Sequence, residues 1–239
     1  MTGRGRVRDA LVLAATSVTP AMRRITLGGP DLADFAVAPG SLGPYVKLHV
    51  AGPGGRPVVR TYSVRSHDPH GGELVVDMLL HGEGPGAAFA ANATPGDRVG
   101  LGGPGFIPCG PCSSYILAGD HTGVPAVAQI LAALPREASA RVVLEVPGPG
   151  EEQELATEAA AEIRWLHRPA GAPSRLATAV REGWPARRGD LLVWAGAEAA
   201  IARAIRREAR TVRGVPADRC QVLNYWKAGQ PEGGFSYCD

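Results

Sequence analysis

The chain has 239 residues, of which 45% are hydrophobic and 20% charged, and its formal net charge is +2. This length allows one large domain or two domains of roughly 100 to 130 residues, and the composition is that of a folded globular protein. The small net charge argues against a nucleic-acid-binding protein with a dense basic surface. No apolar run approaches the roughly 20 residues that span a bilayer, so we expect no membrane insertion.

The N-terminal segment is basic and then apolar, but it does not fit a secretory signal. Its apolar stretch, Leu11–Ala15, is shorter than a signal core, and Asp9 interrupts its start. Four cysteines in a chain of this length do not make a disulfide scaffold. We therefore expect a cytoplasmic protein, and a monomer, although nothing in the sequence fixes the oligomeric state.

The first half of the chain alternates short strand-like segments with clusters of Gly, Pro and Asp, a pattern typical of a closed antiparallel β-barrel. A helical segment at about 86–92 interrupts it. The six expected strands are Val7–Thr19, Met22–Gly28, Tyr45–Val50, Val58–Val64, Glu73–Leu80 and Arg98–Leu101.

The second half alternates strands with helices, which indicates βαβ units and a parallel sheet. The stretch 102–111 is rich in Gly and Pro and separates the two patterns, so we predict domains at 1–111 and 112–239. The expected strands are Tyr115–Gly119, Arg141–Val146, Ile163–His167, Leu191–Ala195 and Cys220–Tyr225, and the expected helices are Val124–Leu134, Ser174–Glu182 and Glu198–Val212.

The first group of residues that could bind a ligand is RTYSVR at 60–65, where a predicted strand ends. Strand alternation puts Arg60 and Tyr62 on one face, and Thr61 and Ser63 on the other. An arginine can fork onto a phosphate, a tyrosine ring can lie against a flat heterocycle, and a serine hydroxyl can donate to a ring nitrogen. The alternative is an exposed barrel strand with a surface arginine.

The second group is VDMLLHGEGPG at 76–86, which leads into the expected short helix. Small glycines let the backbone approach a pyrophosphate, and the free amides of a helix start favour an anion. A glycine-rich turn is often only a turn, so this segment gains meaning from its neighbours.

The order of these motifs resembles the siderophore-interacting proteins, the ferric-siderophore reductases among the ferredoxin-reductase-like flavoproteins. The resemblance covers nearly the whole chain, and it implies a six-stranded flavin-binding barrel followed by a parallel-sheet nucleotide-binding domain. The motifs that carry it are RTYSVR, VDMLLHGEGPGAAFA and PGDRVGLGGPG in the first half, and LAGDHTGVPAVAQILAALP, VVLEV, IRWLHR, VWAGAEAAIARAIRREAR and NYWKAG in the second.

The resemblance implies FAD in the first domain and NADPH or NADH in the second. The placement of the nicotinamide nucleotide in the second domain agrees with the rule that ligands bind beyond the carboxyl ends of parallel strands. The residues implied for FAD are Arg60, Thr61, Tyr62, Ser63, Asp77, Met78, His81, Gly84, Gly86 and Ala87. Those implied for the nicotinamide nucleotide are Gly119, Asp120, Thr122, Gly123, Trp194, Ala195, Gly196 and Glu198.

The resemblance also implies a ferric siderophore as substrate, with Fe(III) reduced so that Fe(II) is released. Lys47 and Lys227 are the only lysines of the chain, and both fall where the family has basic residues. They are expected to bind the chelate. The alternative is that Lys47 is an outward-facing strand residue and Lys227 a surface charge near the C-terminus. The cofactors carry the chemistry, so we predict no catalytic triad, and Ser63 is the residue expected to tune the flavin. No metal site is predicted, because the histidines are not spaced for one.

The chain departs from the family pattern at several positions. The family often has Trp at Phe89 and a hydroxyl residue near Ala87, and its tail commonly reads like YWRRG where this chain has YWKAG. Two alternatives stay open, and the lost basic position favours the first of them. One is a related flavin oxidoreductase acting on an organic substrate in specialised metabolism. The other is a non-catalytic protein that binds a flavin or a chelate.

Two further signals are weaker. Cys109 and Cys112 copy the thioredoxin tetrapeptide, but a strand follows them rather than a helix, so a redox role is not favoured. Phe235 and Tyr237 could stack on the flavin or belong to a frayed terminus. The choice between NADH and NADPH stays open, with cations at Arg141, Arg164 and Arg168 able to meet a 2′-phosphate.

Overall fold

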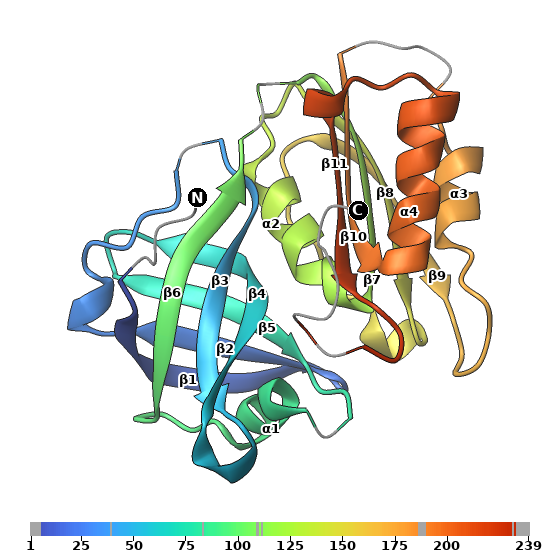
Figure 1. Cartoon of the computed structure of the whole chain (residues 1–239). Coiled ribbons are helices and arrows are strands. Elements are labelled where there is room, and N and C mark those ends of the chain that lie inside the picture. The colour runs from blue at the N-terminus through green and yellow to red at the C-terminus, as the bar shows by residue number, and fades with distance from the viewer. Residues whose placement is uncertain are drawn as a thin grey trace. The chain divides into compact units, whose positions relative to one another are not determined.

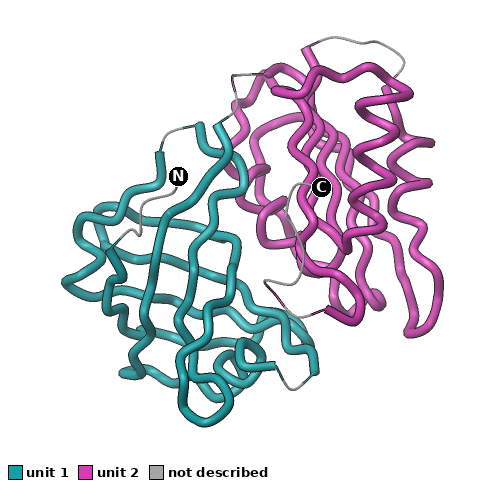
Figure 2. Tube along the Cα trace, in the orientation of Figure 1, with its two compact units in different colours: residues 1–108 teal, residues 109–239 magenta. Residues whose placement is uncertain are grey.

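The computed structural model describes residues 6–38, 40–82, 84–108, 110, 112–185, 190–230 and 232. The chain divides into two compact units, 1–108 and 109–239, shown in teal and magenta in Figure 2. The division after residue 108 lies close to the boundary predicted after residue 111. Each unit has a buried hydrophobic core of its own. Among the described residues, no helix combines the length and hydrophobicity that crossing a bilayer requires.

Unit 1 is a closed barrel of six antiparallel strands, which confirms the predicted fold of the first half. The strands follow one another around the barrel as β1-β2-β5-β4-β3-β6. Their bounds are β1 Arg8–Thr19, β2 Met22–Gly28, β3 Leu42–Ala51, β4 Pro57–Asp68, β5 Glu73–Leu79 and β6 Arg98–Ile107; the helix α1 spans Pro85–Asn92, and short 3-10 turns lie at Pro30–Leu32 and Pro53–Gly55.

The barrel core forms because alternate residues of each strand point inward. Val46 and Leu48 of β3 and Val76 of β5 are fully buried in it. The helix α1 packs against the same core through Phe89 and Ala90. This packing fixes the start of α1 close to the middle of β4, where the first group of predicted site residues lies.

Unit 2 is a five-stranded parallel sheet, as predicted, and helices cover both of its faces. Figure 1 shows α2 on one face and α3 and α4 on the other. The bounds are β7 Ser114–Asp120, α2 Val124–Ala133, β8 Ser139–Val146, β9 Ala160–His167, α3 Leu176–Glu182, β10 Leu191–Glu198, α4 Ala199–Arg207 and β11 Cys220–Trp226, with short helical turns at His121–Gly123, Pro149–Glu151, Glu208–Val212 and Ala217–Arg219.

The strand order of this sheet is β11-β10-β7-β8-β9. The chain therefore runs outward from β7 through β8 to β9, and then returns to the other side of β7 for β10 and β11. Such a reversal opens a crevice at the carboxyl ends of the two central strands, which is where open α/β sheets bind ligands. In this protein those ends are Asp120 on β7 and Glu198 on β10.

Candidate functional sites in the two units

One face of β4 lies against the first turn of α1. Arg60 and Tyr62 alternate onto this face, and both side chains reach Gly86. A Cβ added to Gly86 would lie 2.0 Å from the Tyr62 hydroxyl oxygen and 3.5 Å from Arg60 Cγ. Glycine at this position leaves the room that the tyrosine occupies. The fold thus brings together three residues that the sequence assigned to one cofactor.

The first turn of α1 presents backbone N–H groups. Its N-cap is Gly84, which has no side chain to cap the helix, and Pro85 follows at the first helical position. A Cβ built on Gly84 would meet nothing within 4 Å, so the space beside the helix start is open. Ala87 is buried in this turn, and His81 is exposed just before it. A helix start without a side-chain cap attracts anions.

The opposite face of β4 carries Thr61 and Ser63. Lys47 of β3 pairs directly with Thr61 across the two strands, and its Nζ lies 3.5 Å from Thr61 Oγ1. Lys47 is exposed, whereas Ser63 is buried. One cation and two hydroxyl groups therefore share this face, a combination suited to a polar or anionic ligand.

Asp77 has a different environment from the other predicted residues. Its side chain is fully buried and accepts two hydrogen bonds of 2.7 Å from Arg24, the residue directly opposite on β2. Arg65, at a bulge in β4, lies 3.7 Å away. These hydrogen bonds raise the pKa of Arg24, and burial lowers the pKa of Arg65. Met78 points into the barrel core and is fully buried, so contact between a ligand and Asp77 or Met78 would involve their backbone.

In unit 2, three predicted glycines pack backbone against backbone at the carboxyl ends of β7 and β10. A Cβ on Gly123 would lie 2.3 Å from the carbonyl oxygen of Gly196, and one on Gly119 would lie 3.1 Å from Gly123 Cα. None of the three has a positive φ. These positions therefore require glycine for close approach, which keeps the two central strand ends together at the crevice.

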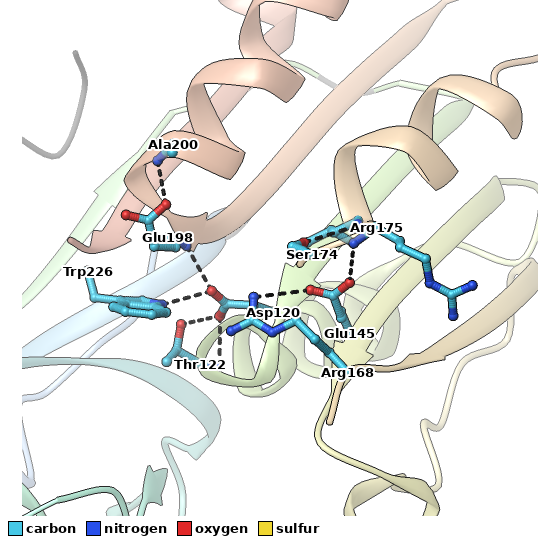
Figure 3. A network of polar contacts seen from close by, with 10 residues as sticks. Asp120, Thr122, Glu145, Arg168, Ser174, Arg175, Glu198, Ala200 and Trp226 are labelled. Atoms are coloured by element: carbon cyan, nitrogen blue, oxygen red, sulfur yellow. Dashed lines mark hydrogen bonds and ion pairs between the residues drawn. The ribbon is translucent and has the colours of Figure 1, made fainter. Parts of the chain in front are cut away.

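Asp120 is the centre of a hydrogen-bond network at this edge (Figure 3). One carboxylate oxygen, Oδ1, accepts from the Thr122 amide at 2.9 Å and from its hydroxyl at 2.6 Å. The other, Oδ2, accepts from the Glu198 amide and from the Trp226 indole Nε1, both at 2.8 Å. The residue Asp120 is 6% exposed. It thereby ties the ends of β7, β10 and β11 together.

The remaining predicted residues of β10 support this edge. Glu198 Oε2 accepts from the Ala200 amide at 2.6 Å and caps α4, while Oε1 accepts from the Ala228 amide at 3.3 Å. Trp194 is fully buried, with its ring edge-on to Tyr225 at 6.1 Å, and Ala195 is fully buried as well. The Trp194 side chain is therefore enclosed in the interior of unit 2.

The three candidate arginines for a 2′-phosphate lie in different places. Arg141 and Arg164 lie within β8 and β9 and pair with Glu162 at 3.7 Å and Glu182 at 3.9 Å. Arg168 lies just beyond the carboxyl end of β9, 3.5 Å from the buried Glu145, which also accepts from the Arg175 amide at 2.7 Å (Figure 3). Arg168 is therefore the candidate placed at the carboxyl edge of the sheet.

Several expectations concern residues outside the part of the chain that the structure describes. Cys109 and the aromatic residues Phe235 and Tyr237 are among them. Cys112 is described: it is buried, and its Sγ contacts the guanidinium of Arg219. The strand β7 follows it, as expected.

Two family sequence models match the chain in succession. The model described as "Siderophore-interacting FAD-binding domain" matches residues 49–107, and the one described as "Siderophore-interacting protein" matches residues 112–229. The chain belongs to the siderophore-interacting protein family. The resemblance read from the sequence is thereby confirmed.

Relatives of the protein agree with this membership. The ferric vibriobactin reductase ViuB of Vibrio cholerae is 33% identical over 186 residues, which cover 75% of this chain and 68% of ViuB. A siderophore utilization protein from T. fusca has a similar structure, with a TM-score of 0.87 and 32% identity over 100% of this chain and 98% of that one. The siderophore-interacting protein SipS from Aeromonas hydrophila gives 0.85 and 29%, over 96% and 94%.

The residues of unit 1 fit the FAD that the family binds. A diphosphate needs donors and cations, and the structure offers a helix start without a side-chain cap, open space beside Gly84, and Arg60 on the adjoining strand. Tyr62 provides a ring beside them, partly packed on the barrel core. This donor set matches the chemistry of the cofactor.

Two residues of these networks, Arg24 and Trp226, were not among the residues predicted from the sequence. Arg24 neutralises Asp77 from a strand that is distant in sequence, and no local pattern links the two. Trp226 stands within the motif NYWKAG, but a tryptophan beside a lysine does not reveal that its indole bonds to Asp120. Only the strand order of each unit brings these pairs together.

Proposed function

We propose that the protein is an FAD-dependent NAD(P)H oxidoreductase that reduces Fe(III) in a siderophore complex. The observation that carries the proposal is the cluster of Arg60, Tyr62 and Gly86 at the open start of α1, in a chain of the siderophore-interacting family. The relation to a protein named as a ferric vibriobactin reductase supports the choice of substrate.

In this proposal each part of unit 1 has a defined task. Arg60 and the first amides of α1 would hold the diphosphate, and Tyr62 would lie against the flavin ring. The strand twist beside the bulge at Arg65 would bring the Ser63 hydroxyl, from the opposite face of β4, to the edge of the ring, where it would donate and tune the flavin. When bound, the flavin accepts two electrons from a nicotinamide and passes them on singly. Lys47, exposed on the Ser63 face of β4, would attract an anionic ferric chelate.

Unit 2 would bind the nicotinamide nucleotide at the crevice between the ends of β7 and β10. The close backbones of Gly119, Gly123 and Gly196 shape this edge. For each NAD(P)H oxidised to NAD(P)⁺, two ferric chelates would be reduced and one proton released. Hard oxygen donors hold Fe(II) less tightly than Fe(III), so reduction would release the metal.

The Arg60→Ala variant tests the cofactor assignment. Loss of a charge-assisted hydrogen bond to phosphate weakens binding about 10- to 100-fold, so we expect this variant to purify with little flavin, measured as visible absorbance per protein. Arg56→Ala, on the exposed turn before β4, is the control and should purify yellow. A fully yellow Arg60→Ala protein would show that the phosphate assignment is wrong.

The Lys47→Ala variant tests the substrate assignment. An exposed cation acting on an anionic ligand is worth about 2- to 5-fold in affinity, so the KM for a ferric tris-catecholate should rise by that factor while flavin content stays constant. Turnover with a neutral quinone is the control. Equal KM values for the chelate in variant and wild type would refute a role for Lys47. Faster turnover of the quinone than of the chelate by the wild type would favour an organic substrate.

A further inference from the structure

We propose that Asp120 is a positioning residue that fixes Lys227 through Trp226, and that it is not a ligand of the nucleotide. The proposal rests on the proposed function and on the expectation, taken from the family resemblance, that Lys227 helps Lys47 to bind the ferric chelate. It gives a different task to a residue that the family resemblance placed in the nucleotide site.

The first argument is the number of acceptor positions on Asp120. An ionised carboxylate has two oxygens with about four lone-pair positions in total. Four donors of the chain itself fill them: the amide and hydroxyl of Thr122, the amide of Glu198 and the indole of Trp226. A ribose or amide donor of a nucleotide would have to displace one of these bonds, and a buried negative charge would repel its phosphates.

The second argument is the position of Lys227 between two anchored neighbours. Trp226, immediately before it, donates its indole N–H to Asp120, a residue 106 positions earlier in the chain. Ala228, immediately after it, donates its amide to Glu198 Oε1 at 3.3 Å. Both acceptors stand at the carboxyl ends of the central strands β7 and β10. The backbone on both sides of the lysine is thus anchored to the edge of the sheet.

The third argument is the turn that follows. The carbonyl oxygen of Lys227 accepts from the Gln230 amide at 3.0 Å, which closes a short reversal of the chain just after β11. The backbone of Lys227 is therefore defined by bonds before, at and after it. Its side chain stays partly exposed. A long cation on a fixed backbone loses less freedom when it binds an anion, which raises affinity without any added contact.

The test uses Trp226→Phe, which keeps an aromatic ring and removes only the donor to Asp120. Preorganisation of one side chain is worth about 2- to 5-fold, so the KM for a ferric tris-catecholate should rise by that factor. The KM for NADPH and the turnover of a neutral quinone should stay at wild-type values. Trp165→Phe, on β9 of the same sheet, is the matched control and should change none of these quantities.

A double-mutant cycle distinguishes positioning from a general structural effect. If Trp226 acts through Lys227, then Trp226→Phe should have no further effect on the chelate KM in a Lys227→Ala background. Additive effects, or a rise in the NADPH KM, would overturn the proposal. An effect of Lys227→Ala with none from Trp226→Phe would overturn it as well and leave the proposed function intact. If Lys227→Ala has no effect, the inference fails, while NADPH-driven reduction of the chelate still tests the proposed function separately.

Discussion

The closest approach of two backbones at the predicted nucleotide site gives a sharp prediction for Gly123→Ala. The new Cβ would lie 2.3 Å from the Gly196 carbonyl oxygen, and an ordinary contact begins at 3.4 Å, so the strand ends would have to separate by about 1.1 Å. Gly123 has φ −84° and ψ −15°, which any residue adopts. The substitution therefore tests steric crowding alone.

The magnitude follows from two opposing effects. Overpacking costs about 1–3 kcal/mol, and the upper end applies because the obstacle is backbone and cannot rotate away. Alanine restricts the unfolded chain more than glycine does, and at a compatible φ and ψ this returns at most about 1 kcal/mol. We expect a net loss of about 2 kcal/mol, which lowers the Tm by about 4–8 °C in a protein of this size.

Calorimetry and nucleotide titration together check this expectation. Gly150→Ala is the matched control, since a Cβ there would meet nothing within 4 Å, and its Tm should equal that of the wild type. Separation of the strand ends should also weaken NADPH binding, measured by isothermal titration. A Gly123→Ala protein with the Tm and the NADPH affinity of the control would refute the view that this contact shapes the site.

Two further expectations concern charges of unit 1. Asp77→Asn leaves the partly buried Arg24 without its counter-ion, so the free energy of unfolding should fall by about 2–4 kcal/mol. The control is Glu73→Gln, at an exposed position of the same strand, which should have little effect on this free energy. Loss of flavin from Asp77→Asn at unchanged Tm would instead indicate that Asp77 contacts the cofactor directly. Burial lowers the pKa of His67, which lies edge-on to Phe35 at 5.2 Å. Below about pH 6.5 the unfolded chain therefore binds more protons than the folded chain, and the free energy of unfolding should fall as the pH drops through that range. His67→Gln should flatten this part of the profile of unfolding free energy against pH, and an identical slope would contradict the assignment.

The strands and helices could be predicted from the sequence, but the side-chain pairs between distant strands could not. All the strands and helices expected in the two halves are present, because alternation and helical periodicity are local properties. The ends of β4 and β6 were missed. The strand β4 continues from Val64 to Asp68 past a bulge at Arg65, through polar residues that lack the hydrophobic alternation of a strand. The strand β6 continues through a glycine-rich stretch that reads as a loop and is held by pairing with β3.

The pairs that organise the sites could not be found in the same way. Arg24 meets Asp77 because β2 and β5 are neighbours in this barrel, with these two residues in register. Trp226 meets Asp120 because β10 lies between β7 and β11 in the sheet. Both facts depend on strand order, which follows from packing of the whole unit and not from the spacing of residues along the chain.

Membership of a motif and contact with a ligand are separate properties, and the structure offers a way to tell them apart. Met78 and Trp194 stand in motifs but are fully buried, and Asp77 and Asp120 have both carboxylate oxygens engaged by the chain itself. Residues of this kind hold others in place, so their loss should reduce stability and binding together. The Arg60 side chain is half-buried on β4, beside Gly86 in the first turn of α1, and in the proposed function it contacts the diphosphate, so its loss should reduce flavin binding while the Tm of the flavin-free protein stays constant. The loss of ligand binding relative to the loss of stability, measured for each variant, therefore distinguishes the motif residues that contact the ligand from those that support the site.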